Sequence, residues 1–203
     1  GATTGAGHPT NVTIQNGTTL NLPNGNTGTL YAMGGDLTIN GSSELDMGGM
    51  SEELDVDGGV SVNDGTLTLG SSVGGDLFVA GDFTVNDTIV DNDRLVKFDG
   101  GSSQTVNGTT DPIPFAFLEV DNSDGVTLNT GVDTEDELRL TNGTLTTNGN
   151  LTLRSTSETD IAAIAGSGSG SVSGNVNFER FLDKADDASH FRFLAAPTGT
   201  GLS

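Results

Sequence analysis

Closely spaced aspartates are the residues of this chain whose types and spacing best suit chemistry. They occur in the motifs L-D-V-D-G-G, V-D-N-D-R and V-D-N-S-D-G. A calcium ion takes several oxygen ligands from flexible carboxylates and carbonyls, which such motifs can supply. We therefore predict weak calcium binding, with no other cofactor, and the candidate ligands are Asp55, Asp57, Asp91, Asp93, Asp121 and Asp124.

Tight turns are the alternative explanation for these aspartates. None of the motifs matches an EF-hand loop or the G-G-x-G-x-D repeat of calcium-binding β-rolls. Asp and Asn readily adopt the corner conformations that turns require. The same two interpretations apply to a further acidic group, Asp133, Glu135 and Asp136.

Groups for nucleophilic catalysis do not converge in the sequence. The two histidines, His8 and His190, lie near opposite ends of the chain, and cysteine is absent. Serine and threonine are abundant, but they need a neighbouring base to act as nucleophiles. We therefore expect no enzymatic activity.

Basic residues offer one catalytic alternative. Parallel β-helix enzymes that cleave acidic polysaccharides gather carboxylates, Lys and Arg on one sheet face, where a base abstracts a proton. Arg139 and Arg154 can approach one another on adjacent coils, and Arg94 and Lys97 can flank the V-D-N-D motif. Solvated charges on a strand face are the simpler explanation of these residues.

The charge balance excludes several classes of partner. The formal net charge is −21, from 28 acidic and 7 basic side chains. Nucleic acid binding needs basic patches, so we expect no nucleic acid partner. No apolar run approaches the ~18–20 residues of a membrane span. The N-terminus lacks a basic and then apolar signal segment, so an exported protein would be represented here by a mature fragment.

Alternating apolar pairs followed by Gly, Asn or Asp corners recur along almost the whole chain. Only 33% of residues are hydrophobic and 5% aromatic, which suits a thin core better than a broad one. Between Val126 and Leu151 the apolar positions recur about every six or seven residues, closer than in a sandwich. We predict an all-β, right-handed parallel β-helix of about 20 residues per coil, with a β-sandwich as the alternative. The predicted strands are Val12–Ile14, Leu20–Leu22, Leu37–Ile39, Leu45–Met47, Leu54–Val56, Val60–Val62, Leu67–Leu69, Leu77–Val79, Phe83–Val85, Val126–Leu128, Leu138–Leu140 and Leu151–Leu153.

Three stretches interrupt this rhythm. Asp111–Phe117 combines two prolines with two aromatic residues, which predicts an excursion that packs over the coil. Asp160–Ala165 is the one plausible short helix, with Asp160 as its cap. Gly166–Gly174 resembles a linker, but the apolar residues that follow it indicate that the chain rejoins the sheet.

The domain organisation follows from these breaks. We predict a β-solenoid over residues 1–177 and a C-terminal cap, or the start of a following module, over residues 178–203. A solenoid end needs a cap because it exposes apolar core and strand edges. The residues expected to close it are Phe178, Phe181, Phe191 and Phe193.

The second half of the chain resembles a known group of proteins. Its motifs are F-D-G-G-S-S-Q-T-V-N-G, F-L-E-V-D-N-S-D-G-V-T-L-N-T-G-V and L-R-L-T-N-G-T-L-T-T-N-G-N-L-T-L, then N-V-N-F-E-R-F-L and F-R-F-L-A-A-P-T. These are similar to secreted, adhesin-like surface proteins of the Bacteroidota, over about Leu95–Pro197. Members are modular proteins, often exported by the type IX route, whose repeats form stalks or adhesive surfaces. The resemblance implies secretion or attachment to the cell surface.

Together these observations predict a non-enzymatic structural or adhesive rod of a secreted or cell-surface bacterial protein. Its expected partners are a surface glycan or a protein ligand, and end-to-end self-association is a further expectation. Three alternatives stay open: a carbohydrate-binding or carbohydrate-cleaving β-helix, an extracellular filament subunit, and an ice-binding protein with a threonine ladder at Thr144–Thr147. The triplet Asp87-Thr88-Ile89 also resembles an O-glycosylation acceptor of Bacteroidota.

Overall fold

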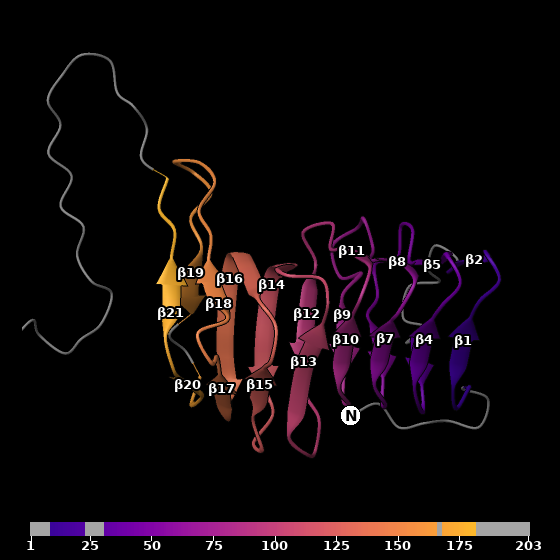
Figure 1. Cartoon of the computed structure of the whole chain (residues 1–203), viewed down its shortest axis with the longest axis horizontal. Helices are drawn as coiled ribbons and strands as arrows, with labels where there is room; N and C mark the ends of the chain where they lie inside the picture. Colours follow the sequence, from indigo (N-terminus) through magenta and orange to yellow (C-terminus); the bar gives the residue numbers. More distant parts are fainter. Residues whose placement is uncertain (1–8, 23–30, 166–167, 182–203) are drawn as a thin grey trace, which may run out of the picture.

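The protein is a parallel β-solenoid of about seven turns. A computed structural model describes residues 9–22, 31–165 and 168–181. Short strands within these ranges form three sheets whose paired strands run parallel. The coils stack side by side along the long axis (Figure 1). The predicted parallel β-helix is confirmed, and the β-sandwich alternative is wrong.

Each of the first four turns passes through three sheets in the same order. Sheet A contains β1 (Val12–Ile14), β4 (Leu37–Ile39), β7 (Val60–Val62), β10 (Phe83–Val85), β13 (Gln104–Gly108), β15 (Val126–Leu128), β17 (Thr144–Thr146) and β20 (Ser171–Ser173). Sheet B contains β2 (Thr19–Asn21), β5 (Ser43–Asp46), β8 (Gly65–Thr68) and β11 (Thr88–Val90). Sheet C contains β3 (Tyr31–Met33), β6 (Leu54–Val56), β9 (Leu77–Val79), β12 (Leu95–Phe98), β14 (Ile113–Asp121), β16 (Val132–Asn142), β18 (Leu151–Leu153) and β21 (Val176–Phe178), with β19 (Ala163–Ala165) beside β16. Nowhere in the described ranges is there a helix long and apolar enough to cross a membrane.

Register between the coils converts the apolar pairs of the sequence into columns of core residues. Leu37 pairs with Val60, and Val60 pairs with Phe83, and all three side chains are fully buried. Side chains alternate between the two faces of a strand, so the middle residue of each triplet points to solvent. Contacts between neighbouring coils commonly join residues 23 apart in sequence, slightly more than the predicted coil length.

Three phenylalanines fill the middle of the core. Phe83, Phe98 and Phe115 are fully buried, and their ring centroids lie 5.8–6.5 Å apart. Two of the three ring pairs are edge-to-face, an arrangement that aromatic quadrupoles favour. Phe115 belongs to β14, so the predicted excursion at Asp111–Phe117 is wrong. Alternation along β14 places the side chains of Ile113 and Phe115 in the core. The free energy gained by burying them outweighs the loss of one backbone hydrogen-bond donor at Pro114.

Sheets B and C merge in the second half of the solenoid. The second half of β14 pairs with β12, so its first half takes the place that sheet B has in earlier coils. In the same way β18 pairs with the first half of β16, and β19 pairs with the second half. A register irregularity between Phe115 and Phe117 marks the corner of β14. In these coils a single long strand, β14 or β16, therefore takes the place of one strand of sheet B and one strand of sheet C.

The predicted helix at Asp160–Ala165 is also wrong. Its last three residues form β19, which pairs with residues Glu137, Leu138 and Arg139 of β16. The unpaired edge of β16 offers backbone hydrogen bonds that a helix of one turn cannot match, since a short helix is intrinsically unstable. The expectation that the chain rejoins the sheet at Val172 and the residues that follow the glycine-serine stretch is confirmed by β20 and β21.

Polar side chains connect the coils at the corners. The Asn63 side chain donates to Asn40 Oδ1 at 3.0 Å, and the Asn86 side chain donates to Asn63 Oδ1 at 3.2 Å. Asp36 Oδ1 accepts from the backbone N–H of Gly59 at 2.8 Å. These residues sit at corners where the sequence pattern predicted only turns. Together with the backbone hydrogen bonds of the sheets, these side-chain contacts fix the register between successive coils.

A buried polar pair, Gln104 and Asn122, joins three successive coils. The Gln104 amide nitrogen donates to the carbonyls of Val79 and Gly81 at 2.9 and 2.6 Å. Its oxygen accepts from the backbone N–H of Gly100 at 3.0 Å and from Asn122 Nδ2 at 2.8 Å. Both side chains are at most 1% exposed. Every polar atom of the glutamine amide is therefore used.

Replacing Gln104 by leucine should destabilise the protein by about 2–4 kcal/mol, because several buried partners lose their hydrogen bonds while packing volume is kept. Urea unfolding followed by circular dichroism measures the change. Gln15→Leu is the matched control, since Gln15 is exposed. Equal unfolding midpoints for the two variants would contradict the assigned role of Gln104.

Candidate functional site

The solvent face of sheet C carries the most varied chemistry of the described residues. We call this surface the sheet C face. It consists of outward side chains on neighbouring strands from β9 to β16: Phe78, Lys97, Phe117, Glu119, Asp121, Glu137 and Arg139. All of them except Glu137 stand between two buried residues, and Glu137 precedes the buried Leu138 and pairs with Phe117. Alternation along each strand therefore directs these side chains outward. The face is partly exposed and runs along the rod.

Cations cover the two aromatic rings of the sheet C face. Lys97 Nζ lies 5.3 Å from the centroid of the Phe78 ring, and Arg139 Cζ lies 5.7 Å from that of Phe117. Both distances fall in the range of cation–π attraction. Each cation also has a carboxylate partner: Lys97 Nζ lies 2.8 Å from Asp121 Oδ2, and Arg139 donates to Glu137 Oε2 at 2.9 Å. The face is thus a row of apolar rings flanked by neutralised ion pairs.

This arrangement offers several kinds of contact on one surface. Aromatic rings offer apolar contact area, and the ammonium, guanidinium and carboxylate groups offer directional hydrogen bonds. The face lines none of the described pockets, so an extended ligand would lie along it. The charges on the face nearly balance, in contrast to the chain's net charge of −21.

An acidic cluster lies beside this face, at the corner that precedes the strands of sheet C. Burial raises the pKa of Asp91, Glu135 and Asp136 above the ordinary values, and like charges raise it further. The like charges come from one another and from Asp93 and Asp160. Asp136 also shares a side-chain hydrogen bond with Asp160. Residues from three coils are thus brought together at one corner.

Asp91 has a structural task within this cluster. Its Oδ2 accepts a hydrogen bond of 2.7 Å from the backbone N–H of Ala116. Ala116 is buried at the corner of β14, where sheet B ends and no ladder supplies an acceptor from the preceding coil. The Asp91 carboxylate therefore accepts the hydrogen bond that a strand of the preceding coil would otherwise accept from Ala116. This role explains why an acidic side chain is partly buried at this corner.

The six candidate calcium ligands lie in three separate places. Asp55 is on the outward row of β6 and only 8% exposed, and Asp57 is exposed just beyond it. Asp121 pairs with Lys97 on the sheet C face, and the Asp124 backbone N–H donates to Asn122 Oδ1 at 2.9 Å in a turn.

Asp91 and Asp93 belong to the acidic cluster. Among the described residues, no group of three or more His, Cys, Asp or Glu side chains is arranged to hold a metal ion. Calcium binding at these aspartates stays a prediction.

The basic residues of the catalytic alternative each have their own hydrogen-bond or ion-pair partners. Arg154 Nη1 lies 3.3 Å from Asp133 and 3.9 Å from Glu135, whereas Arg139 pairs with Glu137. The two arginines therefore have different carboxylate partners.

Arg94 donates to the backbone carbonyl of Asn92, and Lys97 turns toward Asp121 instead of the V-D-N-D motif. His8 and His190 lie outside the described residues.

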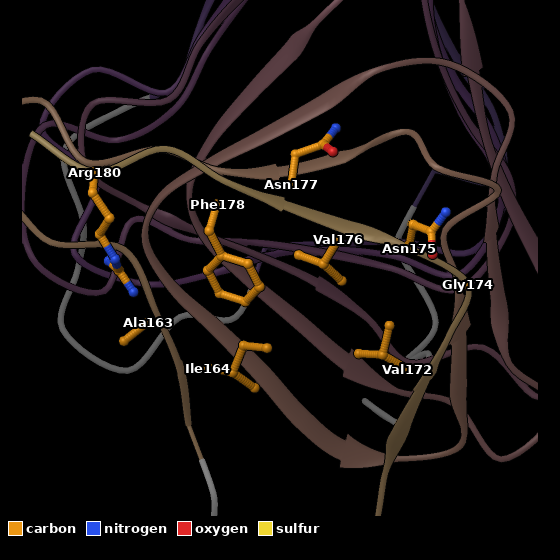
Figure 2. A pocket seen from close by; sticks show the side chains of 9 residues that line it. All are labelled: Ala163, Ile164, Val172, Gly174, Asn175, Val176, Asn177, Phe178 and Arg180. Carbon is orange, nitrogen blue, oxygen red and sulfur yellow. The ribbon is translucent and has the colours of Figure 1, made fainter. Parts of the chain in front are cut away.

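An apolar pocket opens at the C-terminal end of the described solenoid (Figure 2). Its volume is about 790 Å³, and its apolar lining comes mainly from Ile164, Val172, Val176 and Phe178. Arg180 lies at the rim, with its Cζ 5.7 Å from the centroid of the Phe178 ring. Phe178 was predicted to help close this end, and it packs against the core. Phe181 is 42% exposed, and Phe191 and Phe193 lie outside the described residues.

The sheet C face is not apparent from the sequence alone. Phe78, Lys97 and Phe117 are far apart in sequence, and each looked like an isolated residue. Each of these residues stands between two core residues of its strand, and this position predicts that its side chain points outward. To predict which of the outward residues are neighbours, one must also know the register between coils, and the variable length of the corners hides that register in the sequence.

Comparison with known proteins gives no match to a family model, a curated protein or a solved structure.

The acidic cluster predicts a pH-dependent stability. A carboxyl group whose pKa is raised by folding holds its proton more tightly in the folded state. Its protonation therefore stabilises the protein fully below the ordinary pKa of about 4, and this contribution is lost as pH rises through the folded-state pKa. We expect the Tm to rise as pH is lowered from 7 toward 5.

Asp136→Asn should raise the Tm at pH 7 and weaken the pH dependence. Differential scanning calorimetry between pH 5 and 8 measures both. Asp57→Asn removes the same charge from an exposed site outside the cluster and serves as the control. If the two variants gave the same curves, net charge alone would account for the trend.

Proposed function

We propose that this chain is a non-enzymatic structural or adhesive rod of a secreted or cell-surface bacterial protein. The observation that carries the proposal is the unbroken stacking of parallel coils through about seven turns. Such a stack grows in one dimension, and each coil contacts only its neighbours. Length and surface, rather than a central cavity, are what this architecture provides.

Three further observations support this role. The described pockets, including the one at the C-terminal end, are open to solvent, and many of the titratable groups take part in ion pairs, corner contacts and the acidic cluster. A net charge of −21 keeps rods apart in solution. The resemblance of Leu95–Pro197 to secreted surface proteins supports the proposed location and the type IX route.

Stretching a single molecule by its two ends tests the load-bearing part of the proposal. Coils that contact only their neighbours should release one after another. Because paired residues of adjacent coils are 19 to 27 apart in sequence, each event should lengthen the chain by roughly 65–90 Å. Optical tweezers resolve steps of this size, with a globular domain in the same tether as internal control. One all-or-none extension of the whole chain would contradict a stack of nearly independent coils.

A neutral glycan is the adhesive ligand that the sheet C face favours. Phe78 and Phe117 offer apolar contact, and their flanking ion pairs offer donors and acceptors for hydroxyl groups. Acidic polysaccharides are repelled by the net charge of −21.

Glycan-array binding tests this second function. The double variant Phe78→Ser, Phe117→Ser should bind at least about tenfold more weakly than the parent chain, because stacking area is lost. Val73→Ser is the control, since Val73 is an 84% exposed apolar residue away from the face. Binding that survives in the double variant would place the ligand elsewhere, and release of new reducing ends from a bound glycan would overturn the non-enzymatic assignment.

A further inference from the structure

The eight strands of sheet A contain no charged residue, although the chain has a net charge of −21. The other sheets differ in this respect, since Glu44 and Asp46 lie on β5 and Lys97 lies on β12. Sheet A runs along the described rod from β1 to β20, with its strands side by side (Figure 1). The protein therefore has one long uncharged surface, which we call the sheet A face.

A three-residue pattern produces the sheet A face: a hydroxyl residue, a middle residue and an amide residue. Each coil that contributes a strand to sheet A contains it, as Thr13–Gln15, Thr38–Asn40, Ser61–Asn63, Thr84–Asn86, Thr105–Asn107, Thr127–Asn129, Thr146–Asn148 and Ser173–Asn175. The middle residue is buried in all but the last of these coils. Alternation therefore directs the hydroxyl and the amide outward.

Register between the coils aligns the hydroxyl residues into ladders. There are two ladders of four, Thr13, Thr38, Ser61 and Thr84, then Thr105, Thr127, Thr146 and Ser173. The register shifts by two residues between the ladders, so Asn107 instead of Thr105 pairs with Thr84. Within each ladder the hydroxyl repeats about every 4.8 Å along the rod. Of the threonines expected to form a ladder at Thr144–Thr147, Thr146 belongs to the second ladder, whereas Thr147 is fully buried.

The amides of the sheet A face are held in place, whereas its hydroxyls are available. Neighbouring amides bond to one another, as in Asn129 Nδ2, which donates to Asn107 Oδ1 at 2.8 Å. The hydroxyls of Thr38, Ser61 and Thr84 have no hydrogen-bond partner in the part of the chain that the structure describes, and they line an open groove of about 400 Å³. Threonine is stiff at χ1 because it is β-branched. The ladders therefore present hydroxyls to solvent in a fixed array.

An uncharged, repeating lattice of hydrogen-bonding groups is the partner that this face fits. The strands of sheet A offer no carboxylate for a cation and no basic group for a phosphate. Their outward residues include no aromatic or large apolar side chain, so the anchors on which proteins and sugars pack are absent from these strands. Hydroxyl groups both donate and accept hydrogen bonds. The water molecules at an ice surface do the same, in an uncharged lattice that repeats on the scale of the coils.

We propose that the sheet A face binds the surface of ice, through its two hydroxyl ladders and the amides beside them. A preorganised array binds an ordered partner with a smaller loss of entropy than mobile side chains do. The inference goes beyond the rod function and does not depend on it, because the ligand of the sheet C face lies on another sheet. A second copy of this chain on the sheet A face is the competing outcome.

Partition of the protein into growing ice, measured together with thermal hysteresis, tests the proposal. The parent chain should enter the ice and lower the freezing point below the melting point. Thr38→Lys combined with Thr127→Lys places a bulky charge in each ladder and should abolish both effects. Thr66→Lys combined with Thr88→Lys is the matched control, since it makes the same change at outward positions of β8 and β11 on sheet B. The control variant should retain both effects.

Circular dichroism shows whether the variants keep their fold. If the lysine variant unfolds, Thr38→Val combined with Thr127→Val removes only the hydroxyls, keeps the shape of the side chains and should reduce the hysteresis. Exclusion of the parent chain from ice would overturn the proposal. Equal loss in the ladder and control variants would overturn it too, because added charge alone would then explain the effect. A dimer on size-exclusion chromatography that Thr38→Lys with Thr127→Lys dissociates, without ice binding by the parent chain, would assign the face to a second copy instead.

Discussion

Stacking of apolar columns from one coil to the next is the interaction on which this protein depends. Each strand of three or four residues buries only two or three side chains, which is too little to hold a sheet by itself. The column gives each of them a neighbour above and below, as in Leu37, Val60 and Phe83. Burial and backbone pairing therefore come from the same contact. This is why a chain with 33% hydrophobic residues can fold at all.

Polar groups are placed where the columns alone do not determine the structure. The asparagines at the corners connect successive coils, and Gln104 with Asn122 does so inside the core. Asp91 compensates for the end of sheet B by accepting a hydrogen bond from the next coil. These side chains specify register, a property that identical apolar triplets leave ambiguous.

The distribution of charge follows from the same geometry. Most of the short strands have one or two outward positions, so side chains from successive coils form rows along the rod. On sheet C this row contains aromatic rings and paired charges, and at the neighbouring corner it contains carboxyl groups with raised pKa values. The backbone repeats from coil to coil, so the chemical character of each part of the surface depends on which residue occupies the outward position of each coil.

The sequence by itself determined the all-β class, the parallel coil and most of the strands, because alternation in triplets such as Leu37–Ile39 and Leu151–Leu153 depends only on neighbouring residues. It also identifies every basic and acidic residue, but it does not show which of them lie close together in the folded protein. Sequence reasoning failed at Asp111–Phe117 and Asp160–Ala165, where pairing with β16 decided the conformation against local preference. The tertiary structure alone decided which residues share a face. Phe78, Lys97, Phe117 and Arg139 become neighbours only through the register of the coils, and that register is set by long-range hydrogen bonds that no local pattern contains.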